Sequence, residues 1–211
     1  MKILIVDDHP IIRNGIKQII LDISQSNLVD EAEETQEAVQ KAVQNNYDLI
    51  IMDISMPGGG GLEALGQIKK IKPQARVLIL SIYNNEQYIS RAMKAGASGY
   101  LTKTSATDEL HLAIKKIISG GKYFSSEVAQ KLAHIFDSDH NKQKHSNLSE
   151  REFQIFCMLA LGKSINEIGE ELFLSPKTIS THYYRILNKM GMKKNSEIIH
   201  YAVKHSLIDV Q

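Results

Sequence analysis

The sequence predicts an α/β protein with two parts: a doubly wound, five-stranded parallel sheet, followed by an all-α domain. Three observations support this prediction. Short β-branched runs alternate with longer segments of helical period up to about residue 120, no strand signal follows residue 148, and a polar stretch separates the two parts. Continuous apolar strands that alternate with helices are typical of a parallel sheet covered on both faces.

The first part contains four clear strand signals and one weaker signal. The clear strands are Ile3–Val6, Leu49–Met52, Val77–Leu80 and Gly99–Leu101, and the weaker strand is Leu28–Ala32. Apolar residues with a period of about 3.6 follow the strands and predict helices at Ile11–Ile23, Thr35–Gln44, Leu62–Lys70, Gln87–Ala95 and Asp108–Ile118. In such a sheet, function is expected beyond the carboxyl ends of the strands.

A linker separates the two parts. The stretch "DSDHNKQKHSN" at 137–147 is polar and lacks hydrophobic period, which is typical of a connecting segment. We therefore assign residues 1–120 to a first domain, 121–147 to a linker with a helix near 125–136, and 148–211 to a second domain.

Signals at helix ends predict four helices in the second domain. Ser149 and Glu152 match the S-x-x-E capping box, and Ser175 before Pro176 is a typical helix start. With Gly162 and Gly191 as stops, the predicted helices run from Ser149 to about Leu161, over Ser164–Leu172, from Ser175 to about Met190, and from near Ser196 onward.

The composition is that of an ordinary globular protein, with 43% hydrophobic and 23% charged residues. No apolar run approaches the roughly 20 residues that span a bilayer, and the start "MKILIVDD" is a strand pattern rather than a secretory signal. The single cysteine, Cys157, excludes an internal disulfide and a zinc cluster built on cysteine. The histidines also lack metal-ligand spacing. The expected compartment is the cytoplasm.

Positive charge gathers in one short segment, although the net charge is only +1. The stretch from Leu172 to Ser196 contains five basic residues and no acidic residue. Clustered positive charge is typical of nucleic-acid binding, but a solvated helix face can also be basic.

Polar side chains end the predicted strands: Asp7 and Asp8, Asp53, Ser81 and Lys103. Because the carboxyl ends of parallel strands meet at one edge, these side chains are expected to converge. Two carboxylates 5 Å apart repel by roughly 3 kcal/mol at an effective dielectric constant of 20, so three of them need a cation. Oxygen ligands select a hard ion such as Mg²⁺. The alternative is that each aspartate merely caps a strand or helix.

These motifs resemble the receiver domains of bacterial two-component response regulators, which have a flavodoxin-like fold. The matching segments are "VDDHP" (6–10), "DISMPGGGGLE" (53–63), "LS" (80–81) and "AGASGYLTK" (95–103). The resemblance implies that Asp53 accepts a phosphoryl group from a sensor histidine kinase. It also implies that Mg²⁺ is held by Asp7, Asp8, Asp53 and the backbone carbonyl of Ser55, and that Ser81, Lys103 and Tyr100 form the switch.

Two features of these motifs bear on the geometry. Glycines 58–61 suit a tight turn that leaves room for phosphate and metal, and they are no Walker loop because no Lys-Ser/Thr pair follows. Members of the family commonly have Lys-Pro where this chain has Lys103–Thr104, and a cis bond before threonine costs about 3 kcal/mol. The resemblance therefore does not determine the position of the lysine.

The third helix of the second domain has two faces. Ile179, Tyr183, Ile186 and Met190 form an apolar stripe, and the opposite side is short, polar and basic, as a major groove requires. The segment from "LSEREF" to "NKMG" resembles the LuxR-type helix-turn-helix, which places the chain in the NarL/FixJ group. By resemblance, the DNA contacts are Lys177, Thr178, Ser180, Thr181, His182, Tyr184, Arg185, Lys189 and Lys193.

The chain is thus expected to be a phosphorylation-dependent transcription regulator that binds double-stranded DNA as a dimer, and not an enzyme beyond its own phosphotransfer and dephosphorylation. The last helix could pair two copies or close the core of its own domain. An enzyme rival, a phosphatase of the haloacid dehalogenase type, needs an acid at position 55, where this chain has Ser55. A regulator that works without phosphate is the other rival.

Overall fold

The computed structural model describes residues 1–56, 58–137 and 144–208. The chain divides into two compact units, Met1–Asp137 and Ser138–Gln211, and each unit is described by itself. Residues 138–143 of the predicted linker, residue 57 of the glycine-rich motif and residues 209–211 lie outside the described residues. The helices in the described part of the chain are too short or too polar to cross a membrane.

The first unit is a parallel sheet with strand order β2-β1-β3-β4-β5-β6. Five strands confirm the prediction from the sequence: β1 (Lys2–Val6), β2 (Leu28–Ala32), β3 (Leu49–Met52), β4 (Val77–Ser81) and β5 (Gly99–Thr102). The prediction of five strands is one short, because β6 (Tyr123–Phe124) pairs with β5 at the sheet edge. Two residues are too few to show the alternation that identifies a strand.

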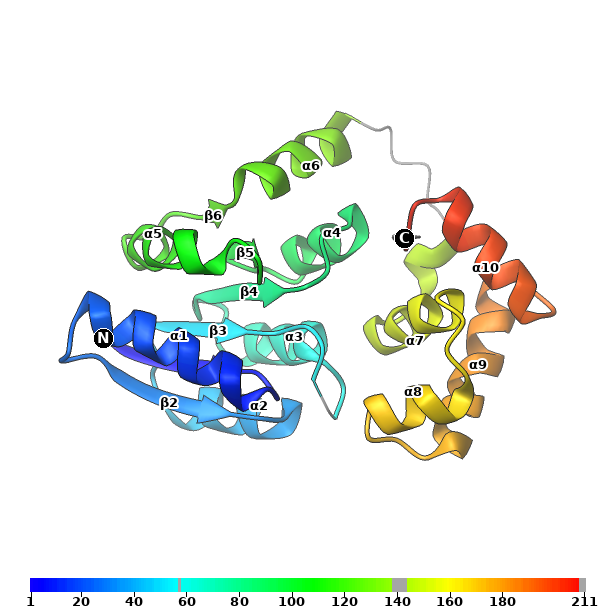
Figure 1. Ribbon diagram of the computed structural model, residues 1–211, viewed down its shortest axis with the longest axis horizontal. Coiled ribbons are helices and arrows are strands. Elements are labelled where there is room, and N and C mark those ends of the chain that lie inside the picture. The colour runs from blue at the N-terminus through cyan, green and yellow to red at the C-terminus, as the bar shows by residue number, and fades with distance from the viewer. Residues whose placement is uncertain (57, 138–143, 209–211) are drawn as a thin grey trace. The chain divides into compact units, whose positions relative to one another are not determined.

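Helices cover both faces of this sheet (Figure 1). They are α1 (Pro10–Ile23), α2 (Thr35–Gln44), α3 (Gly61–Ile71), α4 (Glu86–Lys94) and α5 (Ala106–Ile118). α1 and α5 pack on one face, and α2, α3 and α4 on the other (Figure 1). The four central strands, β1, β3, β4 and β5, are buried along nearly their whole length, for example Ile3, Leu4 and Ile5 at 0% exposure, which explains their continuous apolar sequences.

The predicted helix before the linker is α6 (Ser126–Asp137). Its Val128 is fully buried. The Asn84 amide, in the loop after β4, donates to the Glu127 carboxylate, and the Lys131 ammonium donates to the Asn84 carbonyl. The first helix beyond the receiver-like sheet is therefore tied to the loop that follows Ser81.

The second unit contains the four predicted helices and a short 3-10 turn, η1 (Lys144–Asn147). The helices are α7 (Glu150–Ala160), α8 (Ile165–Glu171), α9 (Pro176–Met190) and α10 (Asn195–Lys204). The capping box of Ser149 and Glu152 is present, and a second one at Ser164 and Glu167 starts α8. The N-cap Ser175 accepts a hydrogen bond from the Thr178 amide, and α9 ends at Gly191 in the left-handed conformation.

Candidate functional site

The register of the sheet brings the strand ends together. Val6 of β1 lies beside Met52 of β3, and the Asp53 amide donates to the Val6 carbonyl (2.9 Å). On the other side, the Lys103 amide donates to the Ser81 carbonyl (2.8 Å). The residues that follow β1, β3, β4 and β5 therefore share one edge, as predicted from the sequence.

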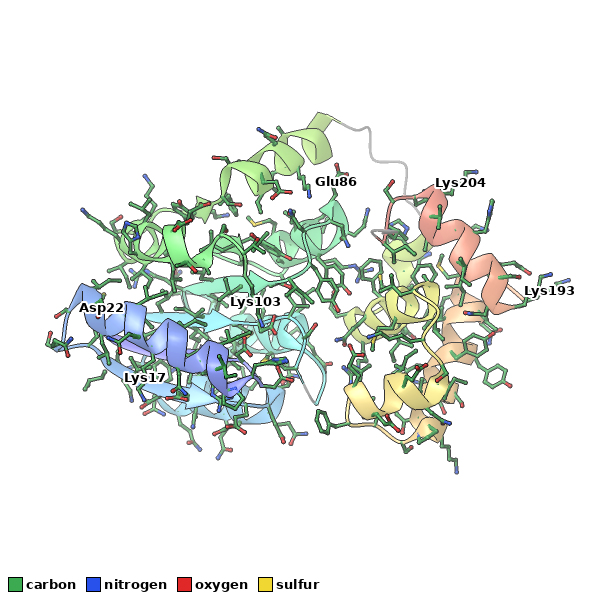
Figure 2. The ribbon with its side chains drawn as sticks, viewed as in Figure 1. Lys17, Asp22, Glu86, Lys103, Lys193 and Lys204 are labelled. Carbon is green, nitrogen blue, oxygen red and sulfur yellow. The ribbon has the colours of Figure 1, made fainter. Side chains whose placement is uncertain are left out.

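Lys103 joins two of the carboxylates. Its ammonium lies 2.8 Å from Asp53 Oδ2 and 2.7 Å from Asp7 Oδ2, and Figure 2 shows it at the ends of the strands. The peptide bond to Thr104 is trans, so the lysine reaches the carboxylates without the proline common in related sequences. Burial lowers the pKa of Lys103, but the Asp53 and Asp7 carboxylates outweigh burial and raise it.

Asp53 is a buried carboxylate at 3% exposure. Its Oδ1 accepts a hydrogen bond from the Ile54 amide (2.7 Å), and its Oδ2 accepts one from Lys103. Burial raises its pKa from 3.8 to about 6, the charge of Asp7 adds to the rise, and Lys103 opposes it. Asp53 is thus mainly ionised at neutral pH, at a cost in stability.

The cost of ionising the buried Asp53 carboxylate predicts that the stability of the fold depends on pH. An acid whose pKa is higher in the folded state stabilises the fold below its unfolded pKa, and that stabilisation is lost as the pH rises through about 6. In the presence of a chelator, we expect the unfolding free energy of the wild type, relative to Asp53→Asn, to fall by about 1 kcal/mol between about pH 5 and 7. Urea unfolding at both pH values measures it. A constant or rising difference would contradict the buried-carboxylate interpretation.

Three carboxylates and a histidine form a cluster suited to a cation. Ligand atoms of Asp7, Asp8, His9 and Asp53 lie within 4.8 Å of one another. The His9 ring lies 2.7 Å from Asp8 Oδ1, a position that the spacing of the histidines in the sequence does not predict. The carboxylate oxygens fit Mg²⁺, which prefers hard ligands. The carbonyl of Ser55 as a ligand remains a prediction.

The predicted switch residues contact the same loop. Ser81 and Tyr100 are fully buried. The Ser81 hydroxyl accepts a hydrogen bond from the Tyr83 amide (3.1 Å), and the Tyr100 hydroxyl donates to the Tyr83 carbonyl (2.6 Å). Burial raises the pKa of Tyr100, so its hydroxyl stays a donor. Any movement of Ser81 toward Asp53 must break its contact with Tyr83.

The glycine-rich loop needs glycine for two different reasons, backbone conformation and lack of space for a side chain. Gly58, Gly59 and Gly60 have positive φ angles, which glycine adopts without strain. Gly61 has an ordinary φ, but a Cβ there would lie 1.8 Å from the carbonyl oxygen of Asp53. Gly61 therefore allows the start of α3 to approach the backbone of Asp53.

The predicted DNA contacts lie on or just beyond α9, with different degrees of exposure. Lys177, Thr181, Tyr184, Arg185, Lys189 and Lys193 are exposed, and Thr178, Ser180 and His182 are partly buried. The Ser180 and Thr181 hydroxyls donate to the carbonyls one turn earlier (2.9 and 3.0 Å). They remain able to accept hydrogen bonds from a base.

Two of these residues face their own domain. The Lys189 ammonium lies 2.6 Å from Glu152 Oε2, the capping carboxylate of α7, so a phosphate must compete with that carboxylate. Burial, followed by the charges of Arg151 and Arg185, lowers the pKa of His182. A neutral ring is a weaker phosphate partner than the exposed Lys177 and Arg185.

The chain matches two protein families. Residues 3–115 match the response regulator receiver domain, and residues 146–202 match the bacterial regulatory proteins of the luxR family. The chain is similar to the response regulator UvrY of Escherichia coli K12, at 36% identity over 212 aligned positions that cover 100% of this chain and 97% of UvrY. The response regulator GacA of Pseudomonas aeruginosa is 35% identical, with 99% and 98% covered.

Solved structures agree with these relatives. RcsB of Salmonella enterica serovar Typhimurium, bound to a promoter with the phosphomimetic BeF3⁻, has a TM-score of 0.61 and 27% identity, covering 95% of this chain and 97% of RcsB. A LuxR-family response regulator from Aurantimonas has a TM-score of 0.61 and 36% identity, covering 65% and 98%. This chain belongs to the NarL/FixJ family of two-component response regulators, transcription regulators that join a receiver domain to a LuxR-type DNA-binding domain.

Proposed function

We propose that this regulator is switched by phosphorylation of Asp53 by a sensor histidine kinase. The observation that carries the proposal is a buried carboxylate that shares Lys103 with Asp7 and lies within a cluster of acids. Asp7, Asp8 and Asp53 would hold Mg²⁺, with the carbonyl of Ser55. The bound ion would neutralise the phosphoryl oxygens during transfer.

The side chains then have separate tasks. A carboxylate oxygen of Asp53 forms a bond to phosphorus while the bond between phosphorus and the kinase histidine breaks, and the released imidazole takes up a proton. Lys103 pairs with a phosphoryl oxygen. The Ser81 hydroxyl turns from Tyr83 to donate to another phosphoryl oxygen, and Tyr100 follows the loop.

The output is DNA binding through α9. The exposed basic and polar side chains of this helix suit a major groove, and the solved structures include RcsB bound to DNA and two RcsB dimers on two parallel DNAs. We infer that the phosphorylated chain binds DNA as a dimer, because two half-sites on one molecule gain from effective concentration. A kinase and a DNA partner both support the cytoplasm as the compartment that we propose for this chain.

The proposal is tested on the full chain by measuring DNA affinity and molar mass with and without acetyl phosphate and Mg²⁺. Both should increase together, and the affinity gain should be on the order of 100-fold if two sites act in concert. An unchanged mass and affinity in a protein that carries the phosphoryl group would contradict the proposed output.

The basic face of α9 gives a second expected result. Lys177→Ala and Arg185→Ala should each weaken DNA binding and lower the slope of log affinity against log salt by about 1, because each removes one phosphate contact. Fluorescence anisotropy at several salt concentrations measures the slope. Lys204→Ala is the matched control, since Lys204 is an exposed cation on α10 of the same domain. Equal slopes for the three variants would contradict the assigned face.

A further inference from the structure

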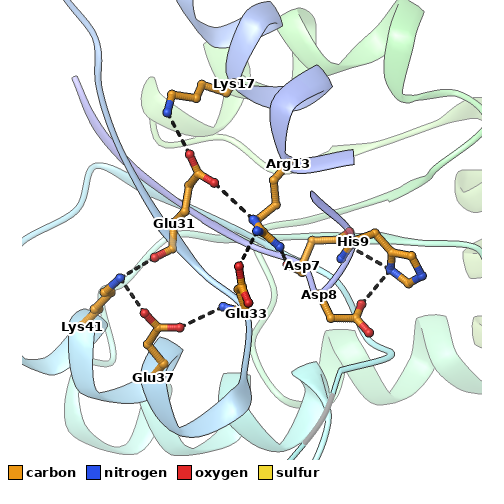
Figure 3. Close-up of polar contacts among 9 residues, drawn as sticks. All are labelled: Asp7, Asp8, His9, Arg13, Lys17, Glu31, Glu33, Glu37 and Lys41. Atoms are coloured by element: carbon orange, nitrogen blue, oxygen red, sulfur yellow. Dashed lines mark hydrogen bonds and ion pairs between the residues drawn. The ribbon is translucent and has the colours of Figure 1, made fainter. Parts of the chain in front are cut away.

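Arg13 of α1 is a buried cation behind the acidic cluster. Its side chain is 7% exposed, and its guanidinium donates hydrogen bonds to three acceptors. Nη1 donates to the carbonyl oxygen of Asp7 (2.7 Å), Nε donates to Glu31 (3.1 Å) and Nη2 donates to Glu33 (2.5 Å). Figure 3 shows this fork between α1 and the end of β2.

The acceptors of Arg13 are themselves held in place. Glu31 also binds Lys17 (2.8 Å), and both side chains of this pair are partly exposed. The Glu33 amide donates to Glu37 (2.9 Å), which pairs with Lys41 (2.7 Å) (Figure 3). A buried guanidinium needs such fixed partners, because an unpaired buried charge is costly.

The contact with Asp7 is made through its backbone. The Asp7 amide donates to the Ala32 carbonyl (3.2 Å), and the Asp7 carboxylate lies beside Lys103 and the His9 amide. The carbonyl that Arg13 binds belongs to the peptide unit that joins Asp7 to Asp8. Fixing the plane of this peptide fixes where the amide nitrogen and Cα of Asp8 lie, because the peptide is planar, and it thereby restricts the positions that the Asp8 carboxylate can reach.

We propose that Arg13 is a positioning residue for the metal site. It acts through the Asp7 carbonyl and aims the Asp8 carboxylate so that Asp8 and Asp53 bind one Mg²⁺. This inference rests on the proposed function. Groups that orient metal ligands typically contribute 10- to 100-fold to metal affinity.

Charge and geometry predict opposite results when Arg13 is removed. Without the guanidinium, Glu31 and Glu33 lose a cation, and the added negative potential near the site would favour Mg²⁺. Loss of the fixed peptide plane would weaken Mg²⁺ binding instead. The sign of the change in affinity therefore separates the two effects.

Calorimetric titration of the full chain with Mg²⁺ tests the inference. Arg13→Ala should raise the Kd by about 10-fold or more. Arg13→Lys keeps the charge but cannot bind three acceptors in a fork, so it should raise the Kd as well. Glu33→Gln still accepts from Nη2 and should keep the wild-type Kd.

Lys17→Ala is the matched control, since Lys17 lies one turn further along α1 and donates to the same Glu31 rather than to the Asp7 carbonyl. Its Kd should stay within about twofold of the wild type, even if its Tm falls as much as that of the Arg13 variants. Equal effects of Lys17→Ala and Arg13→Ala on the Kd would overturn the inference.

Two further outcomes are decisive. Should Arg13→Ala fail to fold, Arg13→Lys decides, and a wild-type Kd for that variant overturns the positioning role. A wild type that binds no Mg²⁺ overturns the proposed function and this inference with it, whereas a wild type that binds Mg²⁺ as tightly as both Arg13 variants overturns only the role of Arg13.

Discussion

Asp53→Asn is expected to abolish the response of the protein to a phosphoryl donor. The carboxamide is not a nucleophile for phosphorus, and it withdraws one of the three carboxylates that would hold Mg²⁺. The ratio of DNA affinity with and without acetyl phosphate should therefore be about 1, against a ratio on the order of 100 for the wild type. Anisotropy titrations with and without the donor measure both ratios.

The matched control is Asp22→Asn. Asp22 is an exposed carboxylate near the end of α1, where it accepts a hydrogen bond from Gln18, and it lies away from Lys103 in Figure 2. This variant loses the same charge by the same chemical change and should respond to the donor as the wild type does. A normal response of Asp53→Asn would refute Asp53 as the switch.

Gly61→Ala is expected to damage both stability and phosphorylation. The new Cβ would lie 1.8 Å from the Asp53 carbonyl oxygen and 2.8 Å from the Asp53 carbonyl carbon, and both are backbone atoms with little freedom to move. Such overpacking costs about 3 kcal/mol, or roughly 10 °C in the Tm of the receiver unit. A displaced Asp53 should also lose on the order of 100-fold in phosphorylation rate.

Gly66→Ala in the same helix is the matched control for this change. A Cβ at Gly66 meets no atom within 4 Å, so the substitution should stabilise α3 by about 0.5–1 kcal/mol through helix propensity. Thermal unfolding and phosphorylation rates of the two variants separate local contact from glycine content. A Gly61→Ala protein as stable and as reactive as Gly66→Ala would contradict the close approach of α3 to Asp53.

The positions of the site residues could be predicted because strand ends in a parallel sheet share one edge. Apolar runs locate the strands, and Asp7, Asp53, Ser81 and Lys103 follow directly from where the runs stop. The structure adds that the Lys103 ammonium pairs with both the Asp7 and the Asp53 carboxylates, and that the peptide bond between Lys103 and Thr104 is trans. No local pattern determines such a pairing, because it depends on side-chain geometry across three strands.

Other features depend on contacts between distant segments. Glu152 is predicted as a helix cap, but its pairing with Lys189, 37 residues away, is not visible in the sequence. Arg13 lies on the amphipathic helix α1 like any surface cation, and only the fold places it beneath the Asp7 carbonyl. Gly61 belongs to a run of glycines that is typical of a flexible turn. The structure shows that glycine is needed at this position because there is no space for a Cβ beside the Asp53 backbone.

The central claim is that the residue-53 carboxylate is the phosphoryl acceptor, and peptide mass spectrometry of the full chain tests it most directly. After incubation with acetyl phosphate and Mg²⁺, followed by borohydride trapping, the account predicts that Asp53 alone carries the modification and that chelation of Mg²⁺ prevents it. A folded protein whose Asp53 stays unmodified under these conditions, or whose modification lies on Asp7 or Asp8, would contradict the account.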